Sequence, residues 1–76
     1  PYVQLGLLAE RQGEYPRAAD YFGSAINREN RNWQWYYLRS RVEHEGGEEA
    51  AAIADLERAR ELNPMENCLR GRWACR

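Results

Sequence analysis

The sequence predicts an all-α protein built as a helical-repeat solenoid, with about five helices in antiparallel pairs. Three observations predict this fold. Apolar residues recur at three- and four-residue steps, glycine and polar turns divide these stretches, and the pattern of the first half returns thirty-four positions later. A helix pair in such an array cannot bury its apolar face alone, so we expect each pair to stack on the next.

The composition describes one small domain without a strong charge. At 76 residues and 43% hydrophobic content, the chain can bury only a small core. Its eleven basic residues, all arginine, are interleaved with twelve acidic ones, which leaves no basic patch for nucleic acid. No apolar run approaches the roughly twenty residues that span a bilayer, so we expect a soluble segment without direct membrane insertion. The sequence leaves the compartment open between the cytoplasm and a bacterial periplasm. Because it begins without methionine and ends just after a Trp-Ala-Cys run, we expect a piece of a longer protein.

Four helices are expected from the periodicity, at about residues 1–12, 15–28, 33–45 and 48–62. Gly13 separates the first from the second, and Pro16 suits a first helical turn. Gly47 separates the third from the fourth. Pro64 prevents the fourth from continuing, because the residue before a proline is pushed out of the helical conformation.

The two halves of the chain match at positions that are small, aromatic or at turns. They pair as Tyr2 with Tyr36, Gly13 with Gly47, Ala18 with Ala52 and Ala25 with Ala59, and more loosely as Gly6 with Ser40, Phe22 with Leu56, Leu8 with Val42 and Asn30 with Pro64. Glycine permits a tight reversal between paired helices, and alanine lets the helices approach closely. This explains why the same residue types recur.

The pattern resembles the tetratricopeptide repeat, which combines an aromatic residue, a large-then-small pair, a glycine turn, spaced alanines and a closing proline. The resemblance covers Pro1 to about Glu66 and implies two repeats, residues 1–32 and 33–66, in a right-handed stack. The residues that it assigns to the repeat framework are Gly6, Gly13, Ala18, Phe22, Ala25, Ser40, Gly47, Ala52, Leu56, Ala59 and Pro64. Arg39 stands where leucine is common and Glu43 where tyrosine is often found, so we expect the second repeat to pack less well.

The last segment, residues 67–76, is expected to form the first helix of a third repeat or a capping helix. Gly71 weakens this expectation, and a helix broken after one turn is the alternative. In one continuous helix the Cα atoms of Cys68 and Cys75 would be about 10.5 Å apart, beyond the roughly 7 Å that a disulfide spans. We therefore favour free thiols, while a disulfide would require a non-helical segment around Gly71.

The sequence contains no pattern that predicts catalysis, a metal site or a cofactor. His44 lies between Glu43 and Glu45, but adjacent side chains on a helix point about 100° apart and do not converge on one atom. The spacing of Cys68 and Cys75 matches no common zinc signature. We therefore expect a protein that is not an enzyme.

Four aromatic residues lie within five positions, Trp33, Trp35, Tyr36 and Tyr37. They cannot all face a core from one helix. We expect Tyr36 and one tryptophan in the core and the others packed on the neighbouring repeat; the alternative is an exposed aromatic site for a partner.

By resemblance, the first helix of each pair lines a concave groove. The groove residues would be Val3, Leu7, Glu10, Arg11, Gln34, Tyr37, Arg41, His44 and Glu45, with Arg72 added by a third helix. Val3, Leu7 and Tyr37 would bury apolar groups of a partner, and the arginines would hold carboxylates or backbone carbonyls. Such a surface suits an extended peptide or a helix.

The favoured function is a non-enzymatic adaptor that presents this preorganised groove to a protein or peptide partner. One alternative is a structural spacer in a large assembly, such as a bacterial secretion or polysaccharide-export complex. Another is a set of accessory repeats beside an enzyme domain in a longer chain. Neighbouring repeats of a longer chain, or an oligomer partner, are also expected.

Overall fold

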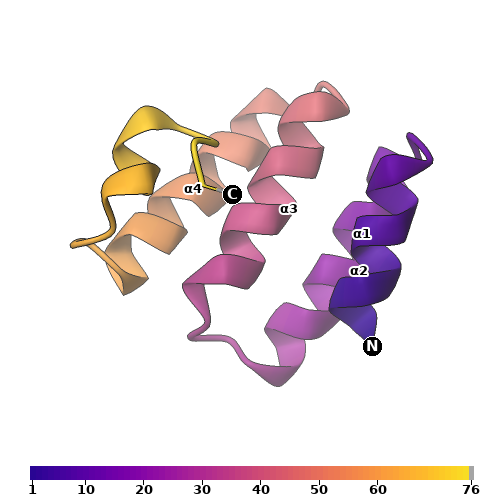
Figure 1. The fold of residues 1–76 in the computed structure, drawn as a ribbon, viewed down its shortest axis with the longest axis horizontal. Coiled ribbons are helices and arrows are strands. Elements are labelled where there is room, and N and C mark those ends of the chain that lie inside the picture. Colours follow the sequence, from indigo (N-terminus) through magenta and orange to yellow (C-terminus); the bar gives the residue numbers. More distant parts are fainter. Residues whose placement is uncertain (76) are drawn as a thin grey trace.

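Four α-helices and one short 3₁₀ helix make up the computed structural model, which describes residues 1–75 (Figure 1). The elements are α1 (Tyr2–Arg11), α2 (Tyr15–Arg28), α3 (Trp33–Glu45), α4 (Glu49–Leu62) and the 3₁₀ helix η1 (Asn67–Gly71). No strand forms within residues 1–75, so the all-α prediction is confirmed. The four α-helices begin and end within one residue of the ranges expected from the periodicity.

Consecutive helices pack against one another: α1 on α2, α2 on α3 and α3 on α4 (Figure 1). The reversals from α1 to α2 and from α3 to α4 each contain a glycine with positive φ, 76° at Gly13 and 86° at Gly47. A side chain is strained in this left-handed conformation, which accounts for glycine at both positions.

The buried side chains form two clusters. The first cluster joins three helices and consists of Ala9, Ala18, Phe22 and Val42, with Val3 and Leu38 packed against it. The second cluster consists of Tyr37, Leu56, Ala59 and Leu69. The first cluster therefore connects one helix pair to the next, and the second connects α3 and α4 to the segment that follows them.

Of the fifth α-helix expected at residues 67–76, the part that the structure describes, residues 67–75, is not α-helical, and Arg76 lies outside the described residues. η1 is a short 3₁₀ turn, and the residues after it, Arg72 and Trp73, have φ values of 45° and 28°, which an α-helix cannot contain. This reversal places the Cα atoms of Cys68 and Cys75 4.9 Å apart, and the two residues form a disulfide. The preference for free thiols was therefore wrong, because it assumed a continuous helix. We call residues 68–75 the C-terminal loop.

Gly6 provides a test of the packing between α1 and α2. A Cβ at Gly6 would lie 2.5 Å from Cε1 of Phe22, whereas at Gly23 the nearest atom would be a guanidinium nitrogen of Arg39, 3.4 Å away. Alanine in a helix interior otherwise gains up to about 1 kcal/mol over glycine. We expect Gly6→Ala to lower the free energy of unfolding by about 1–3 kcal/mol through overpacking, and the control Gly23→Ala to leave it unchanged or raise it. Urea unfolding measures both; equal stability of the two variants would contradict this packing.

Candidate functional site

Two neighbouring hollows open beside α1 and α3, and Arg41 lines both. The aliphatic hollow, of about 430 Å³, is otherwise lined by Gln4, Leu7, Leu8, Glu10 and Arg11 of α1. The aromatic hollow, of about 210 Å³, is otherwise lined by Trp33, Gln34, Trp35, Tyr37 and Leu38 of α3 and by Cys75. Together we call them the α1–α3 surface. It includes several of the residues that were expected to line a groove, among them Leu7, Gln34 and Arg41.

Arg41 is held in the middle of this surface by Glu10 of α1. Its Nε donates to one carboxylate oxygen at 2.8 Å and its Nη2 to the other at 2.6 Å. Burial lowers the pKa of the Arg41 guanidinium, but the hydrogen bonds and the negative charge of Glu10, with the neighbouring Tyr37 and Glu45, together raise the pKa above its ordinary value. Arg41 was expected to bind a partner's carboxylate. Because Glu10 already neutralises it in a bidentate pair, its role in this structure is to fix α1 against α3.

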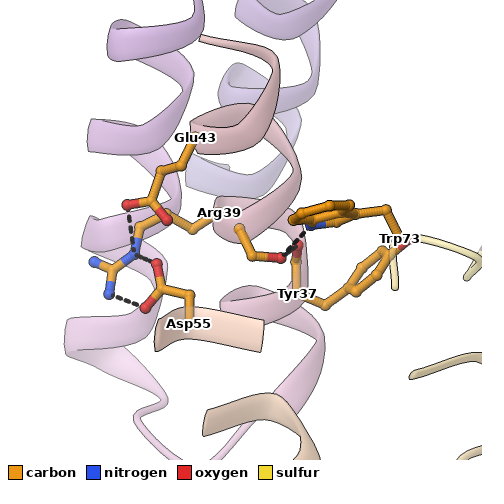
Figure 2. Close-up of polar contacts among 6 residues, drawn as sticks. Tyr37, Arg39, Glu43, Asp55 and Trp73 are labelled. Carbon is orange, nitrogen blue, oxygen red and sulfur yellow. Dashed lines mark hydrogen bonds and ion pairs between the residues drawn. The ribbon is translucent and has the colours of Figure 1, made fainter. Parts of the chain in front are cut away.

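The C-terminal loop covers another part of α3 (Figure 2). Tyr37 is 4% exposed, and its hydroxyl donates to the carbonyl of Cys75 at 3.0 Å. Burial raises the pKa of the Tyr37 phenol. The Trp73 indole donates to Oγ of Ser40 at 2.9 Å, and its ring stacks on His44 with the centroids 4.0 Å apart. The chain itself therefore covers part of the predicted groove.

His44 contacts two side chains while remaining on the surface. Besides the Trp73 ring, its Nδ1 lies 2.6 Å from a carboxylate oxygen of Glu49. The Glu45 residue is exposed overall, but partial desolvation of its carboxylate, followed by a hydrogen bond with Glu10, raises its pKa. The three residues from Glu43 to Glu45 thus make separate contacts.

The remaining groove residues divide by exposure. Leu7, Arg11 and Gln34 are exposed, whereas Val3 is half-buried against the first cluster. Arg72 is exposed and lies in the C-terminal loop. It was expected on the first helix of a third repeat, and that helix does not form within residues 67–75.

The aromatic group of α3 packs within the chain. Trp35 donates from its indole to Glu29 at 2.8 Å, and Tyr36 donates from its hydroxyl to the carbonyl of Asn30 at 2.9 Å. Trp33 packs edge-on against Tyr37, with 6.4 Å between ring centroids. The buried tyrosine is Tyr37 and not the expected Tyr36, because the C-terminal loop covers Tyr37.

A larger hollow of about 510 Å³ lies between the start of α1, the end of α2 and Trp35. Its two charged side chains, Arg28 and Glu29, already have partners within the chain. Glu29 accepts the Trp35 indole, and the guanidinium of Arg28 lies over the ring of Tyr2, 5.5 Å from the centroid. We therefore assign these side chains to the fold.

A charged cluster between α3 and α4 was missed by the sequence analysis (Figure 2). Arg39 donates to both carboxylate oxygens of Asp55, at 2.7 and 2.9 Å, and lies 3.9 Å from the carboxylate of Glu43. Oε1 of Glu43 is buried without a hydrogen-bond partner. Burial, followed by the neighbouring carboxyl group of Asp55, raises the pKa of Glu43 to about 8. This shift favours the protonated form of Glu43 near neutral pH.

The sequence did contain a signal for this cluster. Thirty-four residues earlier, the counterparts of these three charged residues are apolar or aromatic, namely Leu5, Ala9 and Tyr21. All three positions are uncharged in the first repeat and charged in the second. This shared difference indicates that the three charged side chains contact one another, although each alone resembles an ordinary charged residue on a helix surface.

The described residues offer neither a metal site nor a membrane span. Within residues 1–75, no three His, Cys, Asp or Glu side chains are grouped in a way that could hold a metal ion. None of the helices in that range combines the length and the apolar content needed to cross a bilayer.

Residues 3–66 match the family model described as tetratricopeptide repeat. The chain belongs to the tetratricopeptide repeat family. The match includes nearly all of α1 and the whole of α2 to α4 but stops before η1, so the C-terminal loop lies outside the matched region. Tetratricopeptide repeats generally mediate protein–protein interaction and are typically non-enzymatic scaffolds. No curated protein and no solved structure matches the chain.

The raised pKa of Glu43 predicts that stability falls as the pH rises. The folded-state pKa of Glu43, about 8, exceeds the ordinary 4.5. The contribution of Glu43 to the free energy of unfolding is therefore complete below about pH 4.5 and is lost as the pH rises through 8. We expect the free energy of unfolding to be roughly 2 kcal/mol lower at pH 9 than at pH 6. Glu43→Gln should remove most of this difference, and Glu57→Gln, at an exposed carboxylate of α4, should not. Urea unfolding at about pH 6 and about pH 9 measures this difference in the free energy of unfolding. A pH dependence that is as large in Glu43→Gln as in the parent chain would contradict the raised pKa of Glu43.

Proposed function

We propose that this tetratricopeptide repeat chain is a non-enzymatic interaction module, and that its α1–α3 surface binds an extended peptide segment of a protein partner. The observation that carries the proposal is the position of Arg41 between the two hollows. Glu10 fixes this arginine before any partner binds, so the surface is preorganised and binding orders fewer side chains.

The chemistry of the two hollows favours an apolar segment of extended chain. Leu7, 37% exposed, offers aliphatic area in one hollow, and the half-buried Trp33 offers an aromatic face in the other. Residues of an extended peptide alternate in direction, so two side chains that point the same way can enter neighbouring hollows. The exposed amide of Gln34 can bond to the peptide backbone. The Arg41–Glu10 pair is neutral as a unit, so the segment needs no opposite charge.

Peptide selection tests this proposal. The oxidised chain is used to select peptides from a displayed random library, and the affinity of a selected peptide is then measured by calorimetry. We expect Leu7→Asp to weaken binding by about tenfold or more, because it places a charge at an apolar contact. Ala54→Asp, which adds the same charge at an exposed position of α4, should bind like the parent chain. Equal affinities of the two variants, with helix content unchanged, would contradict a site on the α1–α3 surface.

A second candidate is a structural spacer within a larger assembly. The observation that favours it is the packing of Trp33, Trp35, Tyr36 and Tyr37 against their own chain, which uses the aromatic groups for internal stability. If the chain is a spacer, Leu7→Asp would not weaken the binding of any selected peptide.

A further inference from the structure

We propose that the C-terminal loop is a redox-released cap, and that the apolar face beneath it binds α1 of a second copy of this chain once the Cys68–Cys75 disulfide is reduced. This proposal goes beyond the peptide site, because it concerns the face of α3 and α4 under the loop and its association with α1 of another copy. The two surfaces share Leu8, Tyr37 and Cys75, which also line the hollows of the α1–α3 surface. It rests on four observations: the contacts of the loop, the internal repeat, the exposed leucines of α1 and the backbone of the loop.

The loop covers a face whose largest part is apolar. Leu69, which is 1% exposed, packs with Tyr37 of α3 and with Leu56 and Ala59 of α4. Arg60 adds one polar contact, from its Nε to the carbonyl of Leu69 at 2.9 Å. Figure 1 shows the end of the chain folded back beside α3 and α4. Removal of the loop would therefore expose the apolar side chains of Tyr37, Leu56 and Ala59, together with the hydroxyls of Tyr37 and Ser40 to which the loop is hydrogen-bonded.

The same face of the preceding helix pair is where α3 docks. At a shift of thirty-four residues, Tyr37 and Leu56 correspond to Val3 and Phe22. Phe22 lies in the first cluster with Val42 of α3, and Val3 packs against that cluster. The C-terminal loop thus occupies, on the second pair, the place that a first helix takes on the first pair.

α1 carries the other half of this interface, and its leucines are only partly covered within residues 1–75. Leu8 is the repeat counterpart of Val42, yet Leu8 is 43% exposed where Val42 is fully buried. Leu5, one turn earlier, is 41% exposed. A second copy that places α1 on the face of α3 and α4 would repeat a contact that this chain already makes between α2 and α3. Because the two halves of the interface differ, the association runs head-to-tail.

The backbone of the loop explains why reduction should open it. Arg72 and Trp73 adopt positive φ values that residues with a side chain rarely populate and that cost free energy. The disulfide closes the loop around them and keeps them there. A dithiol reductant supplies two electrons and two protons, the S–S bond breaks, Cys68 and Cys75 become thiols, and the dithiol becomes a disulfide. The freed segment can then relax and leave Tyr37 uncovered.

Sedimentation velocity of the 76-residue chain tests the proposal. The samples are the oxidised chain, the chain fully reduced with dithiothreitol, and the Cys68→Ser, Cys75→Ser double variant. The double variant cannot form the disulfide, so its loop needs no reductant to be released. We expect the oxidised chain to be a monomer and the other two to form dimers and longer species. Leu8→Glu in the double variant should restore the monomer. Met65→Glu in the same background, at a residue 82% exposed between α4 and η1, should not.

Three results of this experiment would overturn the proposal. They are a reduced chain that stays monomeric, association as strong in the oxidised chain, and association that Leu8→Glu leaves unchanged. Circular dichroism of the reduced chain must also retain its helix content, since a loss would mean that the disulfide holds the α-helices themselves.

Amide hydrogen exchange gives an independent measure of opening. We expect residues 67–75 to exchange at least tenfold faster in the double variant than in the oxidised chain, under conditions in which both are monomeric. Unchanged protection of this segment would overturn the release of the cap.

Discussion

Each helix pair of this chain has an apolar face that the pair cannot bury alone, and the rest of the structure depends on how that face is covered. On the first pair, α3 covers it, with Val42 fully buried beside Phe22. On the second pair, the C-terminal loop covers it through Leu69. The first contact also places α3 beside α1, where Glu10 and Arg41 can meet. The α1–α3 surface is therefore a consequence of the same packing that forms the core.

The second helix pair is joined in a different way from the first. Where the first pair has apolar or aromatic residues, α3 and α4 are linked by the bidentate pair of Arg39 and Asp55, with Glu43 beside it. Such a pair is directional, so it fixes the position of one helix relative to the other, but desolvation of the charges opposes it. A proton on Glu43 removes one of the two negative charges. The cluster then holds a single carboxylate against a single guanidinium.

Local signals in the sequence predict the helices and their turns, but they do not predict the contacts of the last segment. Periodicity places all four α-helices, and Gly13 and Gly47 mark backbone conformations that the structure shows. The C-terminal loop could not be predicted, because it depends on positive φ at an arginine and a tryptophan, which no propensity favours. The burial of Tyr37 follows from that loop, so it could not be predicted from the sequence either. Arg41 was expected in the groove and lines both hollows, but its partner Glu10 comes from another helix, so their contact depends on tertiary packing.

The position of the C-terminal loop on α3 is the central claim about the second helix pair, and solution NMR of the oxidised chain tests it most directly. The stacking of Trp73 on His44, 4.0 Å between ring centroids, predicts nuclear Overhauser effects between the two rings. The hydrogen bond from the Trp73 indole to Ser40 predicts slow exchange of the indole proton with water. A Trp73 ring with random-coil shifts, no contact to His44 and a rapidly exchanging indole proton would contradict the account.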